Sequence, residues 1–428
     1  MTKQRLLLIT CVFVLQFSFV GSTAIAGENA LIRNAPLPNP DAPSTSAPVS
    51  PPFDINVDEN QNYDSVAAYN SEHAEYLVIW VDPVNNEYEY AIYGQRVDNN
   101  GKTLGATFPI MSLKDRTFLN PDVVYIPKYD KYWLTFTESK DGTKLIWAKS
   151  ISRKGDTLSQ FMITSGATET CCPAITYNSQ DDQVLIVYER RISDFESVIK
   201  AECVEAELGG DCGEGTVSAT TGKKLVVPDV VFNLVKNEYL IAYTLGSNIY
   251  DIKGKRCKSD LSWCSDEISI TPSGYPRQDS VALAAGLDEY LAVWHEDYGT
   301  GVDKIWGRRI GGDGTLHSFI QVTQGSGKRA LGPRAAFGDS GHYLVVSHNG
   351  ADIFGRFIPS AKDTPEGDEF YIEKSIILAY GRLGAACGFS APCLVAHPEV
   401  NQKSGISDIK GRFVGYWNRI HLPVAYRR

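Results

Sequence analysis

The sequence predicts an all-β protein, a seven-bladed β-propeller made of four-stranded antiparallel blades. A short motif led by isoleucine occurs seven times, and successive isoleucines lie 54, 53, 53, 53, 48 and 56 residues apart. Apolar segments of strand length alternate with turn residues, and no helical period competes with them. One fixed period with four short strands per unit is typical of propeller blades. The motif isoleucines are Ile92, Ile146, Ile199, Ile252, Ile305, Ile353 and Ile409.

Residues 1–26 predict a signal peptide. Lys3 and Arg5 precede an apolar run over 6–20, and Ala24-Ile25-Ala26 is a small-residue cleavage site. The run is short for a membrane span. We therefore expect a secreted protein, extracellular, periplasmic or at the cell surface, with no membrane insertion; an uncleaved anchor is the alternative.

Residues 27–52 predict an extended linker, because seven prolines lie there among serine, threonine and alanine. A ligand for a proline-binding module is the alternative. Without the signal peptide the chain has 39 basic and 51 acidic residues, a net charge of −12. This charge argues against nucleic acid and anionic membrane surfaces as partners.

Residues 53–428 predict the propeller itself. Each unit begins with a strand of small and β-branched residues and continues with a strongly apolar strand. The isoleucine motif forms the third strand, and the fourth follows a glycine-rich or charged turn. In the first unit these four strands lie at 65–69, 76–80, 92–97 and 108–111. The second strand is apolar on both faces, as expected for a sheet between two others. A side chain in place of the motif glycine would strike the sheet stacked on it.

Ring closure is predicted from a strand that precedes the first complete unit. Residues 53–57 resemble the last strand of a unit, so we expect them to supply the outer strand of blade seven. Residues 420–426 are the competing candidate.

The repeat resembles that of secreted prokaryotic β-propeller proteins. The resemblance rests on Tyr-Leu-Val-x-Trp at 76–80, Tyr-Leu-Ala-Val-Trp at 290–294 and Ile-Tyr-Gly-x-Arg-Val at 92–97, and it covers 53–428. It implies the propeller fold and no particular activity, since most of those proteins have none assigned. Four blades depart at the arginine, where they carry Ser150, Cys203, Phe357 and Phe413.

Eight cysteines remain after the signal peptide, and the repeat suggests how they pair. Three local disulfides are expected, Cys203–Cys212, Cys257–Cys264 and Cys387–Cys393, each worth about 2–3 kcal/mol. Cys171 and Cys172 form an adjacent disulfide or stay as two thiols. The sequence contains no Cys-x-x-Cys pair, so the cysteines do not indicate a metal site.

The candidate binding face is the one where the second-to-third and fourth-to-first loops emerge. The second-to-third loops carry a charge of −9, and the other set about +2. This face could bind a cationic or polyhydroxylated ligand. Alternatively its acids are solvated or pair with motif arginines, Asp82 with Arg96 and Glu296 with Arg309. The candidate ligand-binding residues are Asp82, Tyr88, Tyr90, Glu138, Glu189, Glu296, Asp297 and Tyr298.

Three histidines fall near the ends of second strands in consecutive blades, His295, His348 and His397. Stacked sheets lie about 10 Å apart, whereas ligands must approach a metal to about 2 Å. His397 also lies one place earlier than the others, so we expect no metal there.

Recognised catalytic signatures are missing, as are phosphate loops and dinucleotide fingerprints. We therefore assign no catalytic residues and no cofactor. We expect an exported, monomeric, non-catalytic propeller that binds a protein or a glycan through the acidic face. The alternative is a carbohydrate-active hydrolase or lyase that uses Asp and Glu residues from different blades on that face.

Overall fold

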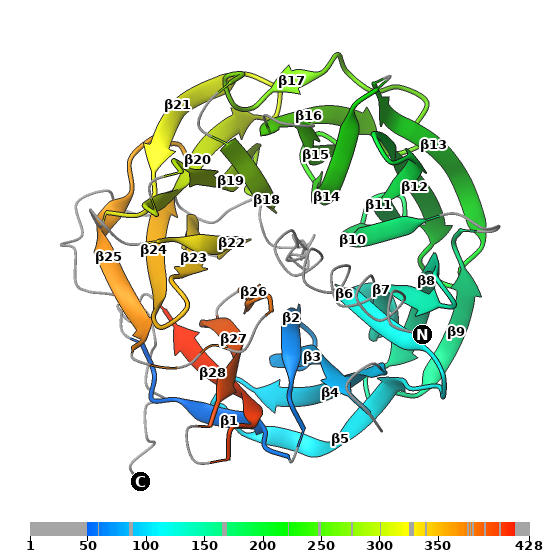
Figure 1. Cartoon of the computed structure of the whole chain (residues 1–428), viewed down its shortest axis with the longest axis vertical. Coiled ribbons are helices and arrows are strands. Elements are labelled where there is room, and N and C mark those ends of the chain that lie inside the picture. The colour runs from blue at the N-terminus through cyan, green and yellow to red at the C-terminus, as the bar shows by residue number, and fades with distance from the viewer. Residues whose placement is uncertain are drawn as a thin grey trace, which may run out of the picture.

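The computed structural model forms a ring of seven radial sheets around a central axis (Figure 1). Each sheet has four antiparallel strands, which confirms the predicted seven-bladed propeller. The structure describes residues 49–415, except 59, 85–88, 165–168, 221, 247–249, 275–276, 300, 325–328, 339, 375, 377, 379–380, 389–390 and 402–403. Over these residues, no helix has the length and apolarity that a membrane crossing requires.

Six blades take their strands in sequence order from the axis outward. Blade 1 contains β2 (Tyr63–Asn70), β3 (Glu75–Pro83), β4 (Tyr90–Asp98) and β5 (Thr103–Met111). Blade 2 contains β6 (Thr117–Ile126), β7 (Lys131–Lys140), β8 (Thr143–Ser152) and β9 (Thr157–Met162). Blade 3 contains β10 (Thr170–Asn178), β11 (Gln183–Ser193), β12 (Glu196–Glu205) and β13 (Asp211–Ala219).

The next three blades follow the same plan. Blade 4 contains β14 (Lys224–Asn233), β15 (Glu238–Gly246), β16 (Tyr250–Lys258) and β17 (Ile268–Ser269). Blade 5 contains β18 (Arg277–Ala285), β19 (Glu289–Asp297), β20 (Asp303–Gly311) and β21 (Leu316–Gln321). Blade 6 contains β22 (Leu331–Phe337), β23 (His342–His348), β24 (Ile353–Pro359) and β25 (Glu366–Glu373).

Blade 7 joins both ends of the described chain. Its strands, from the axis outward, are β26 (Gly384–Ala386), β27 (Cys393–Val400), β28 (Ser407–Val414) and β1 (Phe53–Asn56). The predicted N-terminal outer strand is therefore confirmed, and pairing begins earlier still, since Val49 bridges Val414. The competing segment 420–426 lies outside the described residues.

The core lies between the blades, where second strands are buried on both faces. One apolar cluster joins Leu77 and Ile79 of blade 1 to Leu134 and Phe136 of blade 2. Another joins Leu240 of blade 4 to neighbours in blade 5. Apolar residues at both odd and even positions of a second strand therefore face partner sheets, as the sequence predicted.

The reason given above for the motif glycine is wrong in one respect. A Cβ on Gly94 would lie 3.0 Å from Ile110 Cδ1 and 3.1 Å from Phe108 Cε2, both in β5 of the same blade. A Cβ on Gly411 would lie 2.5 Å from Phe53 Cε2, again in the same blade. The glycine leaves room for side chains of its own outer strand, which fold back over it, and not for the neighbouring sheet.

Four disulfides are present in the described part of the chain. Cys203–Cys212 and Cys257–Cys264 staple the outer hairpins of blades 3 and 4, and Cys387–Cys393 closes the turn between β26 and β27. The adjacent residues Cys171 and Cys172 are also bonded to each other. The three local pairings match those expected from the repeat, and the adjacent pair takes the first of the two states left open for it. Disulfides of this number indicate an oxidising environment.

Candidate functional site

The inner strands share a β-bulge close to the face where the second-to-third and fourth-to-first loops emerge, which we call the loop face. In six of the seven inner strands the register shifts near the start of the strand. At each shift one residue has φ between 39° and 58°. This left-handed backbone conformation is costly for any residue other than glycine. Bulges re-aim side chains and are common beside functional sites. The six residues are Asp64, Asn120, Cys172, Val227, Ser280 and Gly332.

Two aspartates just after these bulges tie neighbouring blades together. The Asp122 carboxylate accepts hydrogen bonds from Val123 N at 3.0 Å and from Ile175 N of blade 3 at 3.0 Å. Asp229 does the same between blades 4 and 5. Burial raises the pKa of Asp122 to about 7 and that of Asp229 to about 8. These carboxylates already serve as acceptors in the ring seams, so they are structural groups.

Two arginines reach the same axial region from blades 6 and 7. Arg382 donates to Pro121 O of blade 2 at 2.7 Å, and Arg334 donates to Leu383 O at 3.2 Å. Burial and the nearby Arg382 lower the pKa of Arg334 to about 10, against the opposing effect of Asp229. The axis therefore holds both signs of charge, contributed by blades that are far apart in sequence.

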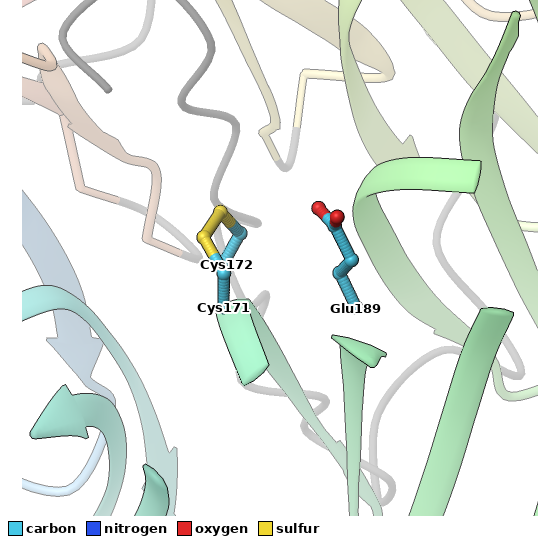
Figure 2. A group of neighbouring side chains, drawn as sticks. All are labelled: Cys171, Cys172 and Glu189. Carbon is cyan, nitrogen blue, oxygen red and sulfur yellow. A yellow bond between two sulfur atoms is a disulfide. The ribbon is translucent and has the colours of Figure 1, made fainter. Parts of the chain in front are cut away.

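The Cys171–Cys172 disulfide and Glu189 form a small site at the loop-face end of blade 3. Cys171 pairs with Glu189 across β10 and β11, so the two side chains lie on the same face of the sheet. Figure 2 shows the disulfide at the start of β10 and the Glu189 side chain extending beside it. One carboxylate oxygen and both sulfurs lie within 4.8 Å of one another. Disulfide sulfurs are not thiolates, so this group is not a metal centre as it stands.

Basic groups and a backbone donor surround the Glu189 carboxylate. Burial raises its pKa to about 7, while Lys224, the backbone N–H of Val227, Arg191 and Lys144 act in the opposite direction. Among the described residues, no basic group lies within ion-pair distance of Glu189. The carboxylate is half-buried and accepts a backbone hydrogen bond, but it has no ion-pair partner.

The predicted histidines do not form one shell. His295 is hydrogen-bonded through Nδ1 to Asp279 Oδ1 at 3.0 Å, and its Nε2 lies 3.8 Å from Asp303 Oδ2. His348 accepts a hydrogen bond from Gly350 N at 3.2 Å, and burial, with help from Arg334, lowers its pKa to about 4. His397 lies apart, beside carboxylates of blades 6 and 7.

The predicted acids all lie on the loop face but do not converge. Glu138 accepts from Trp147 Nε1 at 2.6 Å and is ion-paired with Arg116. Glu296 accepts from Gln278, Trp294 and the Tyr298 hydroxyl, the last at 2.7 Å. Each of these two acids is therefore held by partners from its own blade.

The remaining predicted residues lie around these acids. Asp82 is 2% exposed, and burial together with Asp58 raises its pKa to about 7. Asp297 caps Gly299 N at 2.7 Å, and the Tyr90 ring lies 6.0 Å from that of Tyr63. Tyr88 lies outside the described residues.

The suggestion that motif arginines pair with these acids is wrong. Arg96 pairs with Glu75, and Arg309 pairs with Glu289 at 2.5 Å and Asp363 at 2.7 Å. The motif isoleucine lies at the loop-face end of its strand, and the arginine lies four residues further along. The antiparallel register therefore brings the arginine to the start of the second strand, at the opposite end of the ring.

The fold and its loop face place this chain among the seven-bladed β-propeller proteins. No protein-family model matches the sequence, and no curated protein is a significant match. The chain is similar in structure to a protein of unknown function from Dyadobacter fermentans, with a TM-score of 0.53 and 9% identity over 86% of this chain and 98% of that one.

Two enzymes are also similar in outline. One is the GH93 alpha-L-arabinofuranosidase of Fusarium graminearum, with a TM-score of 0.47 and 12% identity over 85% of this chain and 96% of that one. The other is the NanB sialidase of Streptococcus pneumoniae, with a TM-score of 0.48 and 10% identity over 91% and 72%. At such identities the likeness concerns the fold alone, and these two enzymes take no part in the functional argument.

Proposed function

We propose that this protein is an exported, non-catalytic propeller that binds a glycan on the loop face, with Glu189 and the Cys171–Cys172 disulfide at the centre of the site. The observation that carries the proposal is a half-buried carboxylate without an ion-pair partner, lying beside a compact apolar disulfide. Export is supported by the N-terminal leader pattern and by the four disulfides.

The chemistry of the site suits a polyhydroxylated ligand. A carboxylate offers about four acceptor positions, and sugar hydroxyls are donors that can fill them in pairs. The disulfide presents polarisable sulfur to an apolar C–H face, as methionine sulfur does elsewhere. Lys224 is a nearby donor for ring or carboxylate oxygens. A few placed polar groups beside an apolar surface are typical of small-ligand sites.

A hydrolase is the less favoured function. Glycoside cleavage needs two carboxyl groups about 5–10 Å apart. The groups that offset the burial of Glu189 and lower its pKa are Lys224, the Val227 N–H, Arg191 and Lys144, and none of them is acidic. Asp122 and Asp229 do influence each other, but both are fully buried and both oxygens of each already accept backbone N–H groups.

The test is a glycan array probed with the full chain, followed by titration calorimetry on each glycan that binds. We expect Glu189→Gln to weaken binding at least tenfold, and Cys171→Ser with Cys172→Ser to weaken it as well. Glu202→Gln is the matched control, because Glu202 lies in the same blade with a pKa also raised to about 7, by burial and by Glu214. We expect the control to bind normally.

Three results would count against the proposal. A wild-type chain that binds no glycan contradicts it, as does a Glu189→Gln variant with unchanged affinity. Release of a shorter sugar from a bound glycan would make the protein a hydrolase. Reducing-end assays on the same glycans detect that outcome directly.

A further inference from the structure

His397 is a buried histidine at a position that is aromatic in most blades. It pairs across β27 and β28 with Lys410, the residue after the motif isoleucine. His397 is 0% exposed, and neither of its ring nitrogens has a hydrogen-bond partner in the described part of the chain. A buried imidazole without partners is costly unless something else satisfies it. The same position in blades 1 to 6 holds Trp80, Phe136, Tyr188, Tyr243, Trp294 and Ser347.

Two carboxylates from different blades converge on this histidine. Glu399 lies two residues further along β27, on the same face of the strand, and Glu373 ends β25 of blade 6. One ligand atom from each of His397, Glu399 and Glu373 lies within 4.8 Å of the others. The seam between blades 6 and 7 therefore gathers one imidazole and two carboxylates.

The separations fit a shared metal better than direct hydrogen bonds. His397 Nε2 lies 3.6 Å from Glu399 Oε2, which is too long for a hydrogen bond. Two ligands bound at about 2.0–2.1 Å to a tetrahedral ion lie roughly 3.4 Å apart. Small side-chain movements would bring all three ligand atoms to bonding distance.

Arg412 holds one of the carboxylates in place. Its Nε donates to Glu373 Oε2 at 2.6 Å, and its second terminal nitrogen donates to Glu373 Oε1 at 2.7 Å. Each oxygen keeps a further lone pair, so Glu373 can bind a metal while Arg412 orients it. Metal-binding carboxylates are commonly hydrogen-bonded in this way.

We propose that Glu373, His397 and Glu399 form a Zn²⁺ site that links blade 6 to blade 7. An imidazole with two carboxylates suits zinc, whereas Ca²⁺ and Mg²⁺ prefer oxygen alone. Three protein ligands leave a position for water or a ligand. A hollow of about 260 Å³, lined in part by Glu399, Asp408 and Lys410, opens next to the site. The site is independent of the glycan proposal, which concerns blade 3.

The test uses the full chain, stripped with EDTA and titrated with Zn²⁺ against a chromophoric chelator. We expect one tight site, and a thermal midpoint that rises with Zn²⁺. His397→Phe, which restores an aromatic residue, should weaken binding at least 100-fold, and Glu399→Gln at least tenfold. Co²⁺ in the wild type should give the intense visible absorption of a four-coordinate site.

The matched control is His342→Gln. His342 is hydrogen-bonded to Glu366 Oε2 at 2.5 Å in blade 6 but is not part of a group of three ligands among the described residues. We expect this variant to bind Zn²⁺ like the wild type. Absence of a Zn²⁺ site in the wild type, or equal affinity in the wild type, Glu399→Gln and any folded His397→Phe, would overturn the proposal.

Discussion

Replacing Asp229 tests whether its hydrogen bonds hold neighbouring blades together at the axis. Its carboxylate is fully buried and accepts from Val230 N at 2.8 Å and from Leu283 N of the next blade at 2.7 Å. The equivalent positions of blades 3 and 5 carry Ala174 and Ala282. Asp229→Ala therefore introduces a residue that the fold accepts elsewhere, yet it removes the acceptor of two buried donors.

The expected cost follows from the hydrogen bonds lost. A buried N–H group left unsatisfied costs about 1–3 kcal/mol, so Asp229→Ala should lower the free energy of unfolding by roughly 2–6 kcal/mol. Asp229→Asn keeps one acceptor and should cost about half as much. Urea unfolding with the disulfides intact measures both. Asp260→Ala, an exposed change in the same blade, should stay within about 0.5 kcal/mol.

The pH dependence supplies a second check on Asp229. Its pKa is raised to about 8 in the folded protein, from an ordinary value near 3.8. The folded state then binds the proton more tightly, so this contribution to stability is complete below about pH 4 and is lost as the pH rises to 8. Asp229→Asn should flatten that slope. An Asp229→Ala loss below 0.5 kcal/mol, or an unchanged slope, would refute the reasoning.

Three further outcomes follow from the structure. Removal of residues 1–56 takes away β1 and should lower the thermal midpoint by several degrees relative to removal of residues 1–48, as calorimetry can show. Glu189→Gln should remove a stability term that is complete below about pH 4.5 and lost towards pH 7, because the pKa of Glu189 is raised to about 7; urea titrations across that range detect it. Glu289→Ala leaves the buried Arg309 without its main partner, so we expect unfolding to become easier by about 3–5 kcal/mol, with a smaller loss when both are replaced by apolar residues.

The period and the apolar strands were sufficient to predict the ring, because each blade repeats one local pattern and buries it against the next. The latch was predictable for the same reason, since residues 53–57 look like an outer strand without a blade. The disulfides followed once cysteines could be placed in equivalent hairpins. These features depend on local sequence and on the number of units.

The axial groups could not be predicted in this way. Arg382 of blade 7 reaches Pro121 of blade 2, and Glu373 of blade 6 meets His397 of blade 7, so their proximity exists only after closure. The sequence contains one weak indication of the bulges. In four inner strands a proline follows the residue with positive φ. Proline lacks the N–H of a ladder residue and is tolerated at bulges. The sequence could have shown that Arg96 does not pair with a loop-face acid, because strand direction alone places the arginine away from that face.

On the loop face Glu138 is ion-paired with Arg116, but two other predicted acids there lack the counter-charge that carboxylates at the opposite end of the ring have. Away from the loop face, Glu75, Glu238 and Glu289 each bind a motif arginine at 3.3, 3.1 and 2.5 Å. On the loop face, Asp82 and Glu189 have no basic group within 4.0 Å among the described residues, and burial raises the pKa of both. Acids that only kept the protein soluble would be exposed and free of such a penalty. Their burial without counter-charges argues that the loop face, rather than the opposite one, is arranged to receive donors from a ligand.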